Sequence, residues 1–175
     1  MYKVVDNFLE KNLFKMVEET MLGEDVPWYP HPYVASKQKD SGDDSFYFTH
    51  KFFYNKEVTS GLFDTMIVPI CFILMGRNVP LIRAKANLFT KREKQIKFGL
   101  HKDFDMDKHT TLVYSVNTNN GYTEFEDGTV IPSIANQLLI FDGNMLHRSV
   151  GQTDEKFRVN FNINIETDPE PLCKS

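Results

Sequence analysis

Residues 110–150 read TTLVYSVNTNNGYTEFEDGTVIPSIANQLLIFDGNMLHRSV, and this stretch decides the fold because short strand-like runs alternate in it with turn signals. The runs are residues 110–117, 122–126 and 136–141, and the turns are expected at Asn119–Gly121, Asp127–Gly128 and Asp142–Gly143. Regular short strands with turns between them are typical of an all-β barrel or sandwich.

Further strands are expected on both sides of this stretch. They are YKVV (2–5), FYFTHKFFY (46–54), LIRAKANLFT (81–90) and RVNFNINIE (158–166). The last of them alternates cleanly between apolar and polar residues, which indicates a strand with two chemically different faces.

Two helices are expected in the N-terminal half. Apolar residues recur at helical spacing over residues 10–21. A second helix is expected over residues 61–75, bent at Pro69 and ending at Gly76. The predicted fold class is therefore mainly β with flanking helices, in which two N-terminal helices pack on a double-stranded β-helix core of the jelly-roll or cupin-like kind.

The length of 175 residues fits one domain. We expect a single domain over 1–175, with helical N-terminal support over about 6–80 and the jelly-roll core over about 81–167. The pattern contains no internal repeat that would suggest another organisation.

Composition and charge limit the classes of partner that the protein can be expected to bind. Hydrophobic residues make up 41% and the formal net charge is −4, which gives no general attraction to nucleic acid or anionic lipid. The longest apolar stretch, MIVPICFILMG, is too short to span a bilayer. Cys71 and Cys173 form no disulfide framework. We expect a cytoplasmic protein, in a bacterium or a phage-infected host, without membrane or nucleic-acid partners.

A candidate metal site begins at HKDFD. If residues 101–103 form a strand, His101 and Asp103 point to the same side, and His147 follows 46 positions later after several strands. Two imidazoles and one carboxylate on one face leave coordination positions open, as in non-haem Fe(II) oxygenases. The three residues are the predicted metal ligands. A calcium loop at 103–107 is excluded, because Lys108 occupies the position that requires glycine.

Arg158 lies 11 positions after His147, at the start of an alternating strand. Its planar guanidinium suits a carboxylate held through two parallel hydrogen bonds. For an isolated arginine, a surface salt bridge is the simpler interpretation.

Taken in order, seven motifs resemble the prolyl-4-hydroxylase-like branch of the Fe(II)/2-oxoglutarate-dependent oxygenases, including its small bacterial and phage-type members. The motifs are RAKANL (83–88), HKD (101–103), YSVN (114–117), GYTEF (121–125), PSIANQLLIF (132–141), HRS (147–149) and RVNFNINIE (158–166). The resemblance implies an oxidoreductase that uses Fe(II), 2-oxoglutarate and O2, with ascorbate as a candidate reductant. Its reaction would hydroxylate a peptidyl residue, with proline as one candidate, and release succinate and CO2.

The same resemblance implies roles for pocket residues. Arg158 would pair with the far carboxylate of 2-oxoglutarate, while Asn160, Asn162, Ser115 and Asn87 are candidate cosubstrate-binding residues. A satisfied interior amide is an equally good interpretation of each asparagine. The aromatic strand at 46–54 and the loop at 27–45 are candidates for a substrate groove.

Three departures from the family pattern refine the expectation. Tyr122 replaces the second glycine of G-G, and Ser115 stands where some prolyl hydroxylases have tyrosine. Asn164 replaces the second arginine of the nucleic-acid demethylases, which argues against nucleic-acid repair. Asp103 is retained, which favours hydroxylation over halogenation. Two alternatives stay open: a hydroxylase of a free amino acid or other small molecule, and a non-catalytic jelly-roll binding or structural module.

Overall fold

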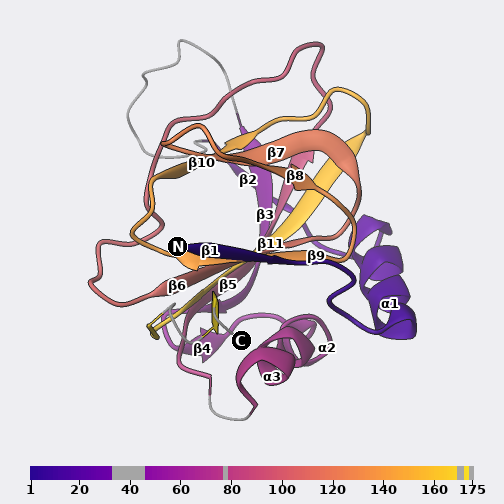
Figure 1. The fold of residues 1–175 in the computed structure, drawn as a ribbon. Coiled ribbons are helices and arrows are strands. Elements are labelled where there is room, and N and C mark those ends of the chain that lie inside the picture. The colour runs from indigo at the N-terminus through magenta and orange to yellow at the C-terminus, as the bar shows by residue number, and fades with distance from the viewer. Residues whose placement is uncertain (33–45, 77–78, 169–171, 174–175) are drawn as a thin grey trace.

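The computed structural model describes residues 1–32, 46–76, 79–168 and 172–173 (Figure 1). The helices are α1 (Lys11–Leu22), α2 (Phe63–Met66) and α3 (Val68–Met75). The strands are β1 (Tyr2–Val5), β2 (Tyr29–His31), β3 (Tyr47–Tyr54), β4 (Glu57–Val58), β5 (Leu81–Thr90), β6 (Thr110–Ser115), β7 (Asn119–Phe125), β8 (Val130–Ser133), β9 (Gln137–Asp142), β10 (His147–Val150) and β11 (Phe157–Ile165).

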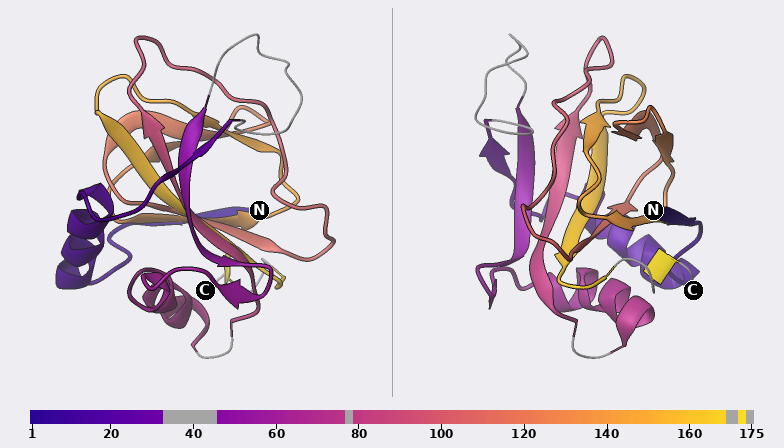
Figure 2. Two further views of the ribbon diagram at one scale, coloured as in Figure 1. Left: turned by 180° about the vertical axis from the view of Figure 1, so that it is seen from behind. Right: turned by 60° about the vertical axis from the view of Figure 1, so that its left-hand side comes forward.

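The strands form two antiparallel sheets. The large sheet has the order β1-β9-β6-β11-β5-β3-β2, with β4 added to β3, and the small sheet has the order β10-β7-β8. The small sheet lies over one face of the large one, and α2 and α3 lie below the lower part of the large sheet (Figures 1 and 2). This arrangement confirms the predicted mainly β jelly roll. Residues 6–80, expected as helical support, also contribute β2, β3 and β4 to the large sheet.

The two faces of the large sheet differ in chemistry. Along β11, Val159, Phe161 and Ile163 belong to the main apolar core, together with Ile67 and Ile70 from the helical segment. The alternate residues of the same strand are polar and turn to the other face, toward the small sheet. The strict alternation of β11 therefore separates a hydrophobic core on one side from a polar cavity on the other.

The prediction of one continuous helix over residues 61–75 is wrong. The chain forms α2 and α3 instead, and Pro69 lies in the first turn of α3. A proline there loses no helical hydrogen bond, because the first N–H groups of a helix have no partner within it. Ser60 helps α2 to begin, since its Oγ accepts a hydrogen bond from the backbone N–H of Leu62 at 3.1 Å.

The turn expected at Asn119–Gly121 is also wrong, because these residues open β7. The bend falls earlier, at Val116 and Asn117. The Asn117 side chain donates to the carbonyl of Phe157 at 2.8 Å and accepts from the backbone N–H of Val159 at 3.0 Å. A side chain that binds the neighbouring strand in this way ends the β6 ladder before the Asn-Asn-Gly sequence is reached.

The loop expected over 27–45 is described in part. Tyr29–His31 form β2, which pairs with β3, and residues 33–45 lie outside the described residues. Among the helices that the structure describes, none has the length and apolar character needed to cross a membrane.

Asn136, from the motif PSIANQ, joins the N-terminal segment to the core. Its Oδ1 accepts hydrogen bonds from the backbone N–H of Leu9 at 2.9 Å and from the hydroxyl of Tyr114 at 3.0 Å. Its Nδ2 donates to the carbonyl of Leu9 at 2.9 Å. The residue has a φ of 59°, a left-handed conformation that asparagine tolerates better than most residues. The side chain thus fixes the approach to α1.

Candidate metal centre and adjoining cavity

His101, Asp103 and His147 converge, and their ligand atoms all lie within 4.8 Å of one another. They do not converge through the strand that was expected over residues 101–103. His101 lies in an isolated β-bridge instead, and Asp103 lies in a bend. In that bridge His101 and His147 exchange both backbone hydrogen bonds, at 2.9 and 3.0 Å. The backbone therefore places the two imidazoles side by side, with ring centroids 4.7 Å apart.

Both imidazoles are oriented by backbone carbonyls. Nδ1 of His101 lies 3.1 Å from the carbonyl oxygen of Gly99, and Nδ1 of His147 lies 3.0 Å from that of Met145. A carbonyl only accepts, so each Nδ1 carries the proton and each Nε2 keeps its lone pair for a metal. Burial lowers the pKa of His147, which favours the neutral ring that a metal requires.

The carboxylate of Asp103 is held in one orientation. Oδ1 accepts from Nη2 of Arg83 at 2.8 Å, and Oδ2 accepts from Nδ2 of Asn162 and of Asn164, each at 2.9 Å. Burial alone would raise the pKa of Asp103, but the charge of Arg83, the nearby His147 and the two amide donors hold it well below its usual range. The group is therefore an ionised carboxylate that is held in one orientation beside the two imidazoles.

A polar row leads away from these three residues along β5 and β11. The pairs in register are Arg83 with Asn164, Lys85 with Asn162, Asn87 with Asn160, and Phe89 with Arg158. Asn87 donates to Asn160 Oδ1 at 2.9 Å, and Ser115 pairs in register with Asn160 on the other side. Asn87, Asn160 and Asn162 line the cavity, whereas Ser115 is buried next to it without lining it.

Arg158 ends this row. Its side chain is 2% exposed, so the interpretation as a surface salt bridge is wrong. Nε donates to Ser133 Oγ at 2.9 Å, and the guanidinium carbon lies 5.2 Å from the ring centroid of Phe89. Nη1 has no hydrogen-bond partner among the described residues. Burial lowers the pKa of Arg158 to about 10, which leaves it charged at neutral pH. A buried, charged group with an unpaired donor suits an anionic ligand.

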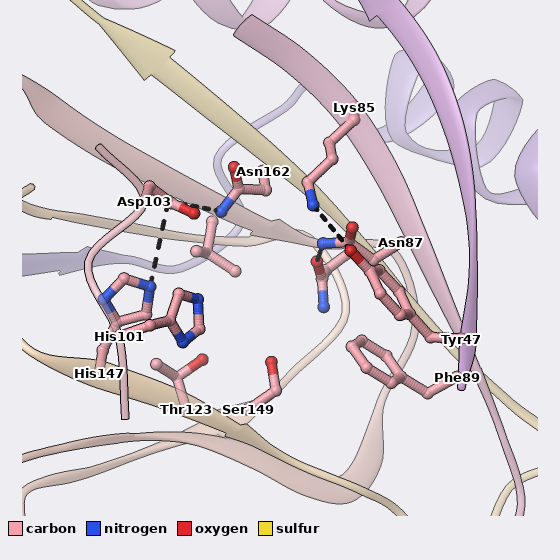
Figure 3. A pocket seen from close by; sticks show the side chains of 12 residues that line it. Tyr47, Lys85, Asn87, Phe89, His101, Asp103, Thr123, His147, Ser149 and Asn162 are labelled. Carbon is pink, nitrogen blue, oxygen red and sulfur yellow. Dashed lines mark hydrogen bonds and ion pairs between the residues drawn. The ribbon is translucent and has the colours of Figure 1, made fainter. Parts of the chain in front are cut away.

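The cavity lies between the two sheets and reaches from the three convergent residues to β5 and β3 (Figure 3). Its other walls contain residues to which the sequence analysis assigned no individual role. They are Tyr47 on β3, Lys85 and Phe89 on β5, Val113 on β6, Thr123 on β7 and Ser149 on β10. The alternation of LIRAKANLF could have revealed Lys85, which lies two positions from both Arg83 and Asn87.

Two facing sheets enclose two imidazoles and a carboxylate, so the fold is a jelly roll with a candidate metal site of the two-histidine, one-carboxylate kind. No protein-family model matches the sequence, and no curated protein matches it. Solved structures do match. An oxidoreductase of the 2OG-Fe(II) oxygenase family from Burkholderia pseudomallei is similar at a TM-score of 0.69 and 11% identity, over 95% of this chain and 86% of that one.

Two further structures have the same fold. A prolyl-4-hydroxylase from Pseudomonas putida is similar at a TM-score of 0.62 and 11% identity, over 95% of this chain and 92% of that one. The epimerase SnoN from nogalamycin biosynthesis, in complex with Fe3+, alpha ketoglutarate and nogalamycin RO, has a TM-score of 0.59 and 12% identity, over 95% of this chain and 78% of its own. The chain thus has the fold of the 2OG-Fe(II) oxygenases, as the resemblance of its motifs implied.

Proposed function

We propose that the chain is a single-domain Fe(II)- and 2-oxoglutarate-dependent dioxygenase that hydroxylates its substrate and releases succinate and CO2. One observation carries this proposal: a two-histidine, one-carboxylate cluster lies at one end of the polar row of β5 and β11, and a buried arginine with an unpaired donor lies at the other end. The fold shared with 2OG-Fe(II) oxygenases supports it.

His101, Asp103 and His147 are the proposed iron ligands, through the two Nε2 atoms and the carboxylate. When bound, Fe(II) and 2-oxoglutarate supply an oxidative decarboxylation that uses O2 and inserts one oxygen atom into a C–H bond. Gly99 and Met145 keep the imidazoles in the tautomer that binds metal, through their carbonyls. The residues of the chain therefore supply position and charge.

Arg158 is the proposed partner of the far carboxylate of 2-oxoglutarate. Ser133 and Phe89 hold its guanidinium in place, one through a hydrogen bond and the other through its ring face. The paired amides of Asn87 and Asn160 form the floor between Arg158 and the proposed iron ligands. This part of the site is buried, so water is excluded from it. The attraction between the guanidinium of Arg158 and the carboxylate of 2-oxoglutarate would therefore be stronger there than in water.

Two substrate classes fit this chemistry. A peptidyl residue, proline included, is suggested by the similarity to the Pseudomonas putida prolyl-4-hydroxylase. A free amino acid or other small molecule is favoured by a charged residue inside the cavity, Lys85. Ascorbate would serve as reductant. The free thiols of Cys71 and Cys173 fit the cytoplasm as the compartment.

The decisive experiment measures the 2-oxoglutarate complex and its turnover together. Under nitrogen, the chain with Fe(II) and 2-oxoglutarate should show the visible charge-transfer band of the chelate, and in air with ascorbate it should form succinate. Asp103→Ala should lose both signals, whereas Asp127→Ala, a change in the exposed turn after β7, should keep both. A non-catalytic jelly-roll binding module would bind without forming succinate.

A further inference from the structure

Lys85 places a cation in the cavity. It reaches in from β5, where Nζ donates to the hydroxyl of Tyr47 at 3.1 Å and lies 5.3 Å from the centroid of the same ring. Among the described residues, no carboxylate lies within 4.0 Å of this ammonium group. The roles proposed above leave Lys85 without a function.

The charges around the cavity do not balance without a further anion. Among the lining residues that the structure describes, Asp103 is the one acid, and its ion pair with Arg83 at 2.8 Å cancels both charges. Fe(II) and doubly charged 2-oxoglutarate would together carry no net charge, so the positive charges of Arg158 and Lys85 would be left over. The far carboxylate of the cosubstrate would engage Arg158, so the ammonium of Lys85 would remain in a poorly hydrated space without a counter-ion.

The position of Lys85 suits a substrate rather than the cosubstrate. Lys85 lies on β5, between β3 and β11, and pairs in register with Asn162 of β11. Its contact with Tyr47 turns its side chain toward β3. Figure 3 shows the proposed iron ligands on one side of the cavity and the Lys85–Tyr47 pair on the other, with open space between them. A molecule held by Lys85 would present its other end to the metal.

We propose that Lys85 and Tyr47 form a recognition site for the carboxylate of the substrate, and that the substrate is therefore a small carboxylic acid such as a free amino acid. This inference rests on the proposed function and specifies its substrate class. The ammonium and the phenol hydroxyl are both donors, so together they match the two oxygens of a carboxylate. Burial raises the pKa of Tyr47 to about 12, which keeps its proton available to donate. A peptidyl proline is neutral and would leave Lys85 unpaired.

The test uses the whole chain loaded with Mn(II) in place of iron and saturated with 2-oxoglutarate, so that no turnover occurs. The probes are the free L-amino acids and, as uncharged-end counterparts, their carboxamides. Paramagnetic Mn(II) broadens the proton resonances of any probe that lies near it. We expect at least one free acid to be broadened far more than its amide, and Lys85→Met to weaken the binding of that acid by about tenfold or more.

Two controls isolate the charge of Lys85. Lys51→Met removes the same charge from the register neighbour on β3, which is exposed, and should leave acid binding within about twofold. Lys85→Arg keeps a cation and should retain part of the binding. Melting curves of each variant establish that it is folded.

Three results would overturn the proposal. They are equal binding of acids and amides, no binding of any acid to the wild-type chain, and a loss of 2-oxoglutarate affinity in Lys85→Met as large as in Arg158→Met, which would make Lys85 a cosubstrate residue. The proposed function fails on a separate measurement, made before any probe is added. It fails if the wild-type chain shows no Mn(II)-dependent binding of 2-oxoglutarate.

Discussion

Arg83 binds the carboxylate of Asp103 and also sets the two amides that bind the same carboxylate. Its Nη2 donates to Oδ1 of Asp103 at 2.8 Å and to Oδ1 of Asn162 at 3.0 Å, and its Nε donates to Oδ1 of Asn164 at 3.1 Å. Each amide oxygen is thereby engaged, so each Nδ2 turns to Asp103. One guanidinium thus fixes three side chains around the proposed metal centre.

Replacing Arg83 with Met is expected to weaken Fe(II) binding by about tenfold or more, because outer residues that orient a metal ligand contribute on that scale. Asp103 would lose its counter-ion and both amides would lose their orientation. Competition with a fluorescent chelator under nitrogen measures the dissociation constant.

Arg92→Met is the matched control for this change. Arg92 stacks on Phe46, 5.4 Å from its ring centroid, away from the proposed ligands. Unchanged iron affinity in Arg83→Met, with the control also unchanged, would mean that Asp103 keeps its position without the guanidinium.

Gly121 is the first residue of the GYTEF motif, and its lack of a side chain leaves room for Arg158. A Cβ at this position would lie 2.8 Å from Cδ of Arg158 and 2.8 Å from the carbonyl oxygen of Val150. Gly121→Ala must therefore move the guanidinium or the strand. We expect 2-oxoglutarate affinity to fall by about tenfold and stability by about 1–3 kcal/mol. The chelate absorption and urea unfolding measure the two effects.

Gly61→Ala is the control for this substitution, because a Cβ there has nothing within 4 Å. It should change neither quantity. Suppose that Gly121→Ala bound 2-oxoglutarate as tightly as the wild-type chain. Arg158 would then either have no part in holding the cosubstrate or be able to move within its buried surroundings without losing the cosubstrate.

Arg158 itself gives a more direct prediction. In Arg158→Lys a point charge replaces a forked donor, and the shorter reach of its single nitrogen cannot serve both Ser133 and a carboxylate. We expect 2-oxoglutarate to bind about tenfold more weakly, with iron affinity unchanged. Titration of the anaerobic chelate separates the two constants, and equal cosubstrate affinity would reject the assigned role.

Local patterns explain what the sequence predicted well. The alternation of RVNFNINIE placed Arg158, Asn160 and Asn162 on one face, because period-two alternation follows from strand geometry alone. The ordered motifs predicted that His101 and His147 lie close together. The strand expected at 101–103 is absent, because the two histidines meet in an isolated bridge. That bridge depends on where the chain returns, which no local sequence pattern shows.

Contacts across the sheet could not be predicted from the sequence for the same reason. Tyr47 and Lys85 are 38 positions apart and meet only because β3 pairs with β5. Asn117 ended β6 earlier than the Asn-Asn-Gly signal suggested, because its side chain binds β11. Such tertiary hydrogen bonds override turn preferences.

Asn136 offers a test of stability that is separate from the site. Asn136→Ala removes the acceptor for Leu9 N–H and Tyr114, removes the donor to Leu9, and places alanine at a φ of 59°. We expect a loss of about 3 kcal/mol, because buried backbone and hydroxyl groups lose their partners. Urea unfolding compares this variant with Asn12→Ala, an exposed change on α1 that should cost less than about 0.5 kcal/mol. Equal stability of the two variants would contradict the anchoring role.

Lys85 links the proposed substrate site to the pH dependence of stability. The pKa of Lys85 is lowered to about 8, chiefly by burial and also by the charges of Arg83 and Lys51, while the charge of Asp103 opposes them. The unfolded chain, with a lysine pKa of 10.5, holds this proton more tightly than the folded chain. Protonated Lys85 therefore destabilises the fold fully below pH 8, and this cost disappears as the pH rises from about 8 to 10.5. Tyr47, with its pKa raised to about 12, stays neutral over this range.

Metal-free Lys85→Met should accordingly be more stable than the wild-type chain at neutral pH, by about 1–2 kcal/mol since part of the side chain remains exposed. The gain should shrink as the pH rises past 8. Urea unfolding at three pH values between about 7 and 10 measures it, with Lys51→Met as the exposed control, which should show a much weaker trend because Lys51 is the smallest influence on the pKa of Lys85. A difference that stays constant with pH would mean that Lys85 carries no buried charge, and the ammonium would then be too well hydrated to require an anionic substrate.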